Sequence, residues 1–517
     1  MLLEVLKEGT FCFKQKDCSI ELRVQRINNV WLISGTVVGR PGRIELLALP
    51  VKEVLLLNNW QSWGPCRTVK KNQQIQVKLN EDWKYSASMF PEIFEKKLVS
   101  DYFFATEGSV AGFLSSRIGH GFFTIEDDRV VACLEYFDRC FDEPTELEPL
   151  FIAENSNTAL LLEHYAEAVK AHNKVEFQSF ETVGWCSWYH YFLDLSWDEL
   201  LKNAKLAGQF GITTFQIDDG YEHDIGDWTI TKESFPRLEE IIEALKGYGL
   251  KVGLWLAPFS ASETSQLFKE HPQWFVSENG EPKMAYKNWN KKIYALDLTR
   301  NDVKRWLWNL FKDLKELGVE YFKIDFLFAG AIPGERTERR TPVEALREGL
   351  KVIREATQGA FILGCGCPLL PAVGLVDGMR IGPDTAPYWG DDKPDAGLPS
   401  AKWALRNAIT RYFMHKRFWV NDPDCLLLRA QQTQMNLQER QIYAYVCGML
   451  DNMIVLSDDL TLLDEEAKNV LRHAVSLRGG KARVENVLST DLTYFITSKG
   501  TKFFVDLNGK KFSFEKL

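Results

Sequence analysis

From about Thr182, short apolar segments alternate with amphipathic helical patterns, and the alternation repeats eight times before about residue 478. Strands that alternate with helices build a parallel sheet, because each helix returns the chain to the same end of the sheet. Eight such units predict a closed (β/α)8 barrel. The expected strands are 182–186, 213–218, 251–257, 321–326, 361–365, 378–382, 417–421 and 452–457.

An open, doubly wound sheet is the alternative arrangement for this pattern. Such sheets often carry a Gly-rich phosphate loop directly after a strand, and no such loop follows any of the eight segments. The barrel is therefore the prediction. The link between 361–365 and 378–382 is short, so we expect no full helix there.

The regions on either side of the barrel pattern are predicted to be β structure. Residues 1 to about 155 contain short runs rich in Val, Ile, Phe and Tyr between turn residues, as in a β-sandwich. A helical pattern follows at 158–173, and strand patterns return from about Lys481. We predict an N-terminal β-sandwich with a connecting helix, a (β/α)8 barrel and a small C-terminal β-sheet domain, at 1–175, 176–478 and 479–517.

Charge and apolar patterning limit the expected partners. The formal net charge is -9 and the pI about 5.6, which argues against a surface for nucleic acid. No apolar run reaches the roughly 20 residues that span a bilayer, and the first residues lack the apolar core of a secretory signal. Ten cysteines follow no short repeated spacing. We expect a cytoplasmic protein that binds neither nucleic acid nor membrane.

Polar residues accumulate where the predicted strands end, which is the end of a barrel that carries the active site. A charged group beside an apolar strand is costly unless it is paired or functional, although an Asp there more often caps the next helix. Lys323 and Asp325 alternate on one strand face that points into the barrel mouth. The other strand-end residues are Asp218, Asp219, Trp255, Cys365, Arg380, Asp384, Asn421, Asp422, Asp458 and Asp459.

Paired carboxylates and abundant aromatic residues favour glycoside chemistry. The 16 Trp offer flat faces for sugar rings, although a Trp-rich core explains them equally well. A retaining glycosidase needs one ionised and one protonated carboxyl about 5–5.5 Å apart. Lys323 favours an ionised Asp325, while Asp384 lies among apolar residues in RIGPDTAPYWG, a setting that suits a protonated carboxyl and that Arg380 opposes. Spacing alone does not select these two Asp from about a dozen candidates.

Eight motifs carry a family resemblance. They are NNWQSWGPC (58–66), GWCSWYHYF (184–192), FQIDDGYEHDIGDW (215–228), GLWLAPF (253–259), YFKIDFLFAGAIPGER (321–336), ILGCGCPLLPAVG (362–374), MRIGPDTAPYWG (379–390) and ALRNAITRYFMHKRFWVNDPDC (404–425). Together they resemble glycoside hydrolase family 36, and most closely the compact bacterial α-galactosidases of thermophiles. The likeness extends over nearly the whole chain.

The resemblance implies a retaining exo-α-galactosidase that hydrolyses terminal α-linked galactose from melibiose- and raffinose-type oligosaccharides. It assigns Asp325 as the nucleophile and Asp384 as the general acid/base. It assigns Asp218 and Asp219 to the 4- and 6-hydroxyls of galactose. The remaining substrate-binding residues that it implies are Lys323 and Arg380 for ring hydroxyls, Trp255 and Cys365 as pocket walls, Trp63 above the pocket, and Trp188 and Tyr189 along its lining.

These roles agree with elementary chemistry. Galactose differs from glucose in its axial 4-hydroxyl, and a site built to hydrogen-bond one hydroxyl rejects an analogue that misplaces it by a factor of about 10⁴. Ionised carboxylates suit this task because they only accept hydrogen bonds. Two carboxylates supply nucleophile, acid and base, so we expect no metal or organic cofactor. A metal or redox pair at Cys365 and Cys367 is the alternative, but no His lies nearby in the sequence.

Other functions remain open at this stage. A galactosyl transferase of the raffinose-synthase type or an α-N-acetylgalactosaminidase would use the same two Asp. A non-catalytic sugar-binding barrel would be expected to lack one of them, and both are present. A phosphate-handling barrel isomerase would need a Gly-rich phosphate site near the last strands, where the sequence offers LSDDLTLLDEE instead. The hydrolase is the preferred prediction, with small α-galactosides as its partners.

Overall fold

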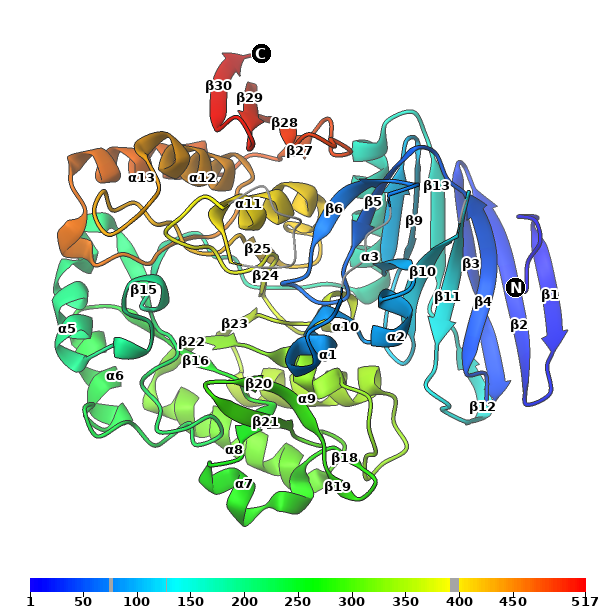
Figure 1. The fold of residues 1–517 in the computed structure, drawn as a ribbon, viewed down its shortest axis with the longest axis horizontal. Helices are drawn as coiled ribbons and strands as arrows, with labels where there is room; N and C mark the ends of the chain where they lie inside the picture. Colours follow the sequence, from blue (N-terminus) through cyan, green and yellow to red (C-terminus); the bar gives the residue numbers. More distant parts are fainter. Residues whose placement is uncertain (74–77, 127, 391–398) are drawn as a thin grey trace.

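The chain forms a barrel with one β region on its N-terminal side and one on its C-terminal side, as seen in a computed structural model that describes residues 1–73, 78–126, 128–390 and 399–517 (Figure 1). Two antiparallel sheets, drawn in blue and cyan, stand beside the barrel, and the red C-terminal strands lie beyond helix α12 (Leu437–Met449). The predicted fold class, a barrel with an N-terminal β-sandwich and a small C-terminal β domain, is confirmed. The domain boundaries stay predictions.

The N-terminal strands bury alternate side chains, because successive residues of a strand point to opposite faces. In β2, Cys18, Ile20, Leu22 and Val24 are buried and the residues between them are more exposed. The larger sheet has the order β1-β2-β3-β13-β9-β8-β5-β6, with β12 on β3, and the smaller has the order β4-β11-β10-β7. The strands are β1 (Gly9–Lys14), β2 (Cys18–Ile27), β3 (Val30–Gly39), β4 (Arg43–Pro50), β5 (Val54–Asn58), β6 (Cys66–Lys70), β7 (Leu98–Asp101), β8 (Phe103–Thr106), β9 (Ser109–Phe113), β10 (His120–Glu126), β11 (Arg129–Glu135), β12 (Phe141–Glu146) and β13 (Leu150–Glu154).

The barrel strands are parallel and almost fully buried, which explains why they read as continuous apolar runs. Each of the eight predicted strands overlaps one of them. A backbone hydrogen bond from Met453 N to Asn421 O (3.0 Å) joins the two end strands. In sheet order they are β25 (Val420–Asp422), β24 (Gly378–Arg380), β23 (Phe361–Gly364), β22 (Val319–Ile324), β16 (Lys251–Leu256), β15 (Ile212–Ile217), β14 (Val183–Cys186) and β26 (Ile454–Leu456).

Helices cover the outside of the barrel, and their starts follow from local sequence. Thr341 and Glu344 form a capping box at the start of α9, with Pro342 in the first turn. The short link between β23 and β24 holds only α10 (Leu369–Ala372), as expected. The longer barrel helices are α5 (Trp197–Leu206), α6 (Leu238–Gly247), α8 (Asn301–Leu317), α9 (Pro342–Thr357), α11 (Ala401–Thr410), α12 and α13 (Glu465–Leu477).

A long excursion between β16 and β22 carries a small antiparallel sheet that we did not predict. It contains β17 (Ser260–Ser262), β20 (Met284–Asn288) and β21 (Lys291–Ala295). The β20–β21 hairpin turns at Trp289 and Asn290, which both have positive φ, at 50° and 56°. Two consecutive residues with positive φ give the tight turn that matches strand twist, but a bulky side chain rarely adopts this conformation.

The N-terminal region is joined to the barrel mouth by its own backbone. Helix α3 (Thr158–Asn173), at the predicted position, packs on β9 and continues the chain toward the barrel. The loop after β5 pairs with the loop after β23, because Ser62 N donates to Cys367 O (2.9 Å) and Leu369 N donates to Trp60 O (3.0 Å). This N-terminal loop therefore forms part of the rim of the barrel.

The C-terminal strands form a four-stranded antiparallel sheet, as predicted. Trp389 Nε1 donates to Leu507 O (2.9 Å), so this sheet contacts the loop that follows β24. Within the described ranges, no helix is both long and apolar enough to cross a membrane. The strands are β27 (Arg483–Val484), β28 (Thr493–Ser498), β29 (Thr501–Asp506) and β30 (Lys511–Lys516).

Candidate active site

Asp325 lies directly after β22, at the mouth of the barrel, and is 6% exposed. Trp255 Nε1 donates to its Oδ2 (3.0 Å) and Phe326 N donates to its Oδ1 (2.8 Å). Phe326 has a positive φ of 52°, a rare conformation for a bulky residue. The backbone thus bends sharply after the strand, and each carboxylate oxygen of Asp325 is held by one donor.

Burial and charge act on Asp325 in opposite directions. Burial raises its pKa above the ordinary value, and Lys323, Cys365 and Trp255 act to lower it. The ammonium of Lys323 contacts Asp218 Oδ2 (2.8 Å). The effect of Lys323 that the sequence predicts is present, but burial outweighs it in the free protein.

Asp218 and Asp219 follow β15 and are both buried. Asp218 Oδ2 accepts hydrogen bonds from Lys323 and Gln216, and Asp219 Oδ2 accepts one from Trp289 Nε1 (2.8 Å). Burial, and then the nearby Glu222, raise the pKa of Asp219 to about 10. The raised pKa favours the protonated form of Asp219, beside Asp218, which accepts hydrogen bonds. The expected roles of the pair toward galactose stay predictions.

Asp384 lies four residues beyond the end of β24, in a loop, and 38% of its side chain is exposed. Its Oδ1 accepts hydrogen bonds from Arg380 Nη1 (3.1 Å) and Nη2 (3.3 Å). Arg380 is buried at the end of β24. Arg380 therefore contacts the candidate acid/base, and Asp384 is the more accessible of the two catalytic candidates.

Asp424 is a member of the site that sequence reasoning missed. Its Oδ2 accepts hydrogen bonds from Arg380 Nη1, from the Tyr189 hydroxyl and from Thr385 N (2.7 Å). The pKa of Asp424 is raised to about 7, mainly by burial. Arg380 acts to lower this pKa, and the charge of Asp384 acts to raise it. Asp424 lies two residues past β25, in NDPDC, just beyond the strand-end position that Asp422 occupies, and this proximity is its only signal in the sequence.

Cys365 connects the two catalytic candidates. It is fully buried after β23, and Trp63 Nε1 of the N-terminal loop donates to its Sγ (3.2 Å). Burial raises the pKa of this thiol, and the charges of both Asp325 and Asp384 raise it further. Asp325 follows β22 and Asp384 follows β24, so both lie at the same end of the barrel strands, on either side of β23, which Cys365 follows. The Cys367 thiol instead donates to Pro368 O (3.4 Å).

Aromatic rings from the N-terminal loop and from the β20–β21 hairpin surround Phe326. Trp63 meets it edge-on with ring centroids 4.9 Å apart, Tyr286 stacks on it at 5.0 Å, and Trp289 lies at 5.2 Å. Trp289 also contacts Trp255, at 6.3 Å. Trp289 is half-buried at the tip of the unpredicted hairpin, so no strand-end pattern pointed to it. These rings support the aromatic walls implied for Trp255 and Trp63.

The other candidates divide between the site and the framework. Tyr189 belongs to the Arg380 cluster, whereas Trp188, half-buried in α4 (Trp188–Tyr191), packs edge-on against Phe192 at 5.2 Å. Three strand-end residues have framework contacts. Asn421 donates to Arg411 O (3.2 Å), Asp458 pairs with Arg429 (2.7 Å) and Asp459 pairs with Lys202 (2.8 Å). Among the described residues, no group of three or more His, Cys, Asp or Glu is arranged to hold a metal ion.

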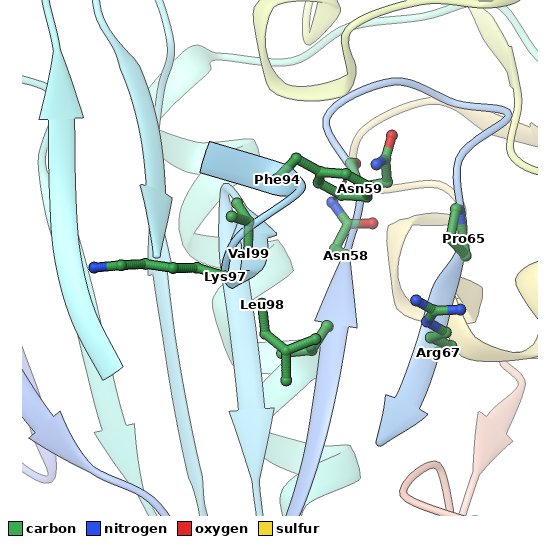
Figure 2. A pocket seen from close by; sticks show the side chains of 9 residues that line it. Asn58, Asn59, Pro65, Arg67, Phe94, Lys97, Leu98 and Val99 are labelled. Atoms are coloured by element: carbon green, nitrogen blue, oxygen red, sulfur yellow. Dashed lines mark hydrogen bonds between the residues drawn. The ribbon is translucent and has the colours of Figure 1, made fainter. Parts of the chain in front are cut away.

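A hollow in the N-terminal region lies away from these residues (Figure 2). Figure 2 shows it between β5, β6 and β7, with Phe94 over Asn58 and with Lys97 extending outward. Its buried amide is already used, because Asn58 Nδ2 donates to Asp101 O (3.0 Å) and Asn58 Oδ1 accepts from Arg411 (3.0 Å). The chemistry-bearing residues are at the barrel mouth, not in this hollow.

Comparisons with known proteins agree with this architecture. The family model "Alpha-galactosidase, N-terminal" matches residues 23–154, and the model "Melibiase" matches residues 157–344. The second match contains Asp218, Asp325 and their neighbours but ends before Arg380 and Asp384. Together the two models match more than half of the chain.

Curated relatives match over a shorter segment. Alpha-galactosidase 1 of Pediococcus pentosaceus is 29% identical over 168 residues, which cover 29% of this chain and 22% of that protein. Alpha-galactosidase AgaA of Geobacillus stearothermophilus is 26% identical over 186 residues, which cover 33% of this chain and 25% of that protein. The matched segment thus spans about a quarter of the length of these relatives or less.

Solved structures share the fold over nearly the whole chain. The α-galactosidase TtGalA of Thermus thermophilus, in complex with p-nitrophenyl α-D-galactopyranoside, has a TM-score of 0.79 at 24% identity and covers 97% of this chain and 100% of that one. The GH36 α-galactosidase AgaA of Geobacillus stearothermophilus has a TM-score of 0.66 at 16% identity, with 94% and 72% covered. The two family models show that this chain belongs to the α-galactosidase family of glycoside hydrolase family 36, and the solved structures show that it shares the fold of that family.

Proposed function

We propose that this chain is a retaining exo-α-galactosidase that releases terminal α-linked galactose through a covalent galactosyl-Asp325 intermediate. One observation carries the proposal. A buried carboxyl held by two donors after β22 and a more exposed carboxyl held by an arginine after β24 lie at the same end of the barrel, with only β23 between their strands. Retaining glycosidases need two such carboxyls with different surroundings.

In the first step, an Asp325 oxygen forms a bond to C1 of galactose while the bond from C1 to the leaving oxygen breaks. Asp384 gives its proton to that oxygen, so the product alcohol leaves neutral. The Trp255 and Phe326 donors each occupy one lone-pair position of the Asp325 carboxylate. A carboxylate has about four such positions, so lone pairs remain for attack.

In the second step, a water oxygen bonds to C1 and gives its proton to the Asp384 carboxylate. The bond between C1 and Asp325 breaks, galactose leaves with its original anomeric configuration, and both carboxyls return to their starting states. The 38% exposure of the Asp384 side chain supports this assignment, because an acid/base that serves both a leaving group and water needs access to each.

Substrate selection is proposed to rest on the Asp218, Asp219 and Lys323 group. Asp218 is an acceptor, burial and Glu222 favour the protonated form of Asp219, and Lys323 has further N–H groups beyond the one that contacts Asp218. This mixture suits the axial 4-hydroxyl and the 6-hydroxyl of galactose, since each hydroxyl both donates and accepts. Related structures hold p-nitrophenyl α-D-galactopyranoside and stachyose, which supports galactose-terminated oligosaccharides as substrates here.

The cellular setting is proposed to be the cytoplasm. All ten cysteines are free thiols, and disulfides form and persist mainly in oxidising compartments. The proposed chemistry uses no metal or organic cofactor, because the two carboxyls supply nucleophile, acid and base.

The test is NMR of the sugar first released from an aryl α-galactoside. We expect α-galactose before mutarotation, which reports galactose specificity and retention of configuration together. First-formed β-galactose, or no release of galactose, would reject the proposal. Raffinose synthesis from added sucrose would favour the transferase alternative, and faster release of N-acetylgalactosamine would favour the α-N-acetylgalactosaminidase.

A further inference from the structure

We propose that Asp424 is a positioning residue that holds Arg380 and supplies the negative charge against which Asp384 keeps its catalytic proton. The inference rests on the proposed function and assigns a residue that neither the strand-end pattern nor the family resemblance singled out.

One guanidinium faces three carboxyls at this end of the barrel. Arg380 Nη1 contacts both Asp384 Oδ1 (3.1 Å) and Asp424 Oδ2, and Arg380 Nε lies 3.8 Å from Asp422 Oδ2. If all three were ionised, this buried group would carry an excess of two negative charges. Such an excess favours uptake of a proton by one of the carboxyls.

The donors around Asp424 favour its ionised form over that of Asp384. Asp424 Oδ2 accepts three hydrogen bonds, from Arg380, from the Tyr189 hydroxyl and from Thr385 N, and Asp424 Oδ1 accepts one from Cys425 N (2.7 Å). Each of these stabilises an ionised Asp424. Asp384 accepts only from Arg380 among the described residues, and that arginine is shared.

The remaining groups around the cluster do not cancel this arrangement. Lys323 faces it from β22 but contacts Asp218, and burial raises the pKa of Tyr189, Tyr443 and Cys425, so these three stay neutral donors. Burial and Asp384 raise the pKa of Asp424 to about 7, and interactions between titrating groups are mutual.

The geometry also gives Asp424 a mechanical role. Thr385 is the residue after Asp384, and its N–H is bound to Asp424. Asp424 has a positive φ of 82°, which Asp tolerates better than most residues. One side chain therefore fixes both the guanidinium that contacts Asp384 and the backbone directly after Asp384.

The experiment is the pH dependence of kcat/KM on melibiose, whose glucose leaving group needs a proton. In Asp424→Asn, Arg380 is less neutralised and Asp384 loses its proton more easily. We expect the alkaline limb of the pH profile of kcat/KM to move to lower pH by about one unit, since a nearby charge shifts the pKa of a carboxyl by about 1–3 units. Asp424→Glu should restore the limb to within about 0.3 units even if the rate falls, because the charge is retained.

The matched control is Asp377→Asn. Asp377 is also buried and paired with an arginine, Arg354 (2.9 Å), but it lies just before β24, at the opposite end of the strand that carries Arg380. The alkaline limb of the pH profile should not move in the Asp377→Asn variant. If Asp424→Asn does not fold, Asp422→Asn tests the same charge balance at 3.8 Å and should give a smaller shift in the same direction.

Rates that fall equally at every pH, with an unmoved limb, would overturn the inference and leave Asp424 a purely structural residue. An unmoved limb in Asp422→Asn would overturn it if that variant had to be used. Absence of melibiose hydrolysis by the unaltered protein at any pH would instead reject the proposed function, so the two failures are distinguishable.

Discussion

The two catalytic carboxyls are held in contrasting ways. Asp325 is buried directly after a barrel strand, and fixed donors of the barrel hold both its oxygens. Asp384 is half-exposed in a loop and is held by one arginine that it shares with Asp424. The barrel backbone therefore positions the proposed nucleophile, whereas a balance of charges positions the proposed acid/base.

The largest effect is expected from Asp325→Ala. Loss of the nucleophile should lower kcat by about 10⁴-fold or more, as removal of nucleophiles does in other covalent mechanisms. Azide should restore part of the rate by entering the vacated space, with formation of β-galactosyl azide as the product to be identified by NMR. Near-normal turnover of raffinose by this variant would show that Asp325 is not the nucleophile, and the contrast between the two carboxyls would then have no catalytic meaning.

Asp384→Ala should have an effect that depends on the leaving group. General acid catalysis contributes about 10²–10⁴-fold, so raffinose hydrolysis should fall by about that factor. An aryl galactoside with an acidic phenol needs little protonation, and its first step should fall much less. The measurement is kcat/KM for both substrates. An equal loss on both would contradict the assignment of Asp384 as the general acid.

Trp289→Phe tests the contact between the hairpin residue Trp289 and the buried carboxyl of Asp219. It removes the N–H that contacts Asp219 and keeps the ring near Phe326. Loss of a hydrogen bond to a buried carboxyl is expected to lower kcat/KM for melibiose by about tenfold. Trp308→Phe, on the exposed face of α8, is the control and should change nothing. An unchanged kcat/KM in Trp289→Phe would show that the N–H of Trp289 has no part in catalysis or substrate binding.

The smallest expected effect is a shift of the acid limb of the pH profile of kcat/KM to higher pH. Burial raises the pKa of Asp325, and an acid with a raised pKa is ionised only above that value. Nucleophilic activity should therefore be lost as the pH falls through a pKa above the ordinary Asp value of about 3.9. Trp255→Phe removes one donor to the ionised form and should move the acid limb higher by about half a unit. A limb at or below pH 4 in the unaltered protein would contradict the burial argument.

The sequence was sufficient to predict the barrel because its strands are buried on both faces. The segment 321–326 is apolar except for the two residues that face the mouth, and the structure has β22 there. The same logic located Asp218, Arg380 and Cys365 at strand ends, where the structure also has them. The family resemblance, rather than the strand pattern, distinguished Asp325 and Asp384 from the framework carboxyls Asp458 and Asp459.

The missed residues share a physical cause. Trp289 sits on a hairpin that interrupts the strand–helix alternation, and it meets Asp219 only through the folded chain, 70 residues apart in sequence. Asp424 lies in an irregular segment past β25, and its importance comes from Arg380 and Tyr189, which precede it by 44 and 235 residues. Local patterns carry no information on such long-range contacts.

The backbone bonds between the loop after β5 and the loop after β23 make the barrel and the sandwich one cooperative unit. Arg411, buried beneath this joint, donates to Ser62 O and Ile381 O, one carbonyl from each partner. Excision of the sandwich would leave buried donors of the barrel without acceptors, which costs free energy for each unpaired group. Calorimetry should therefore record a single melting transition for both, and a barrel expressed alone should not refold.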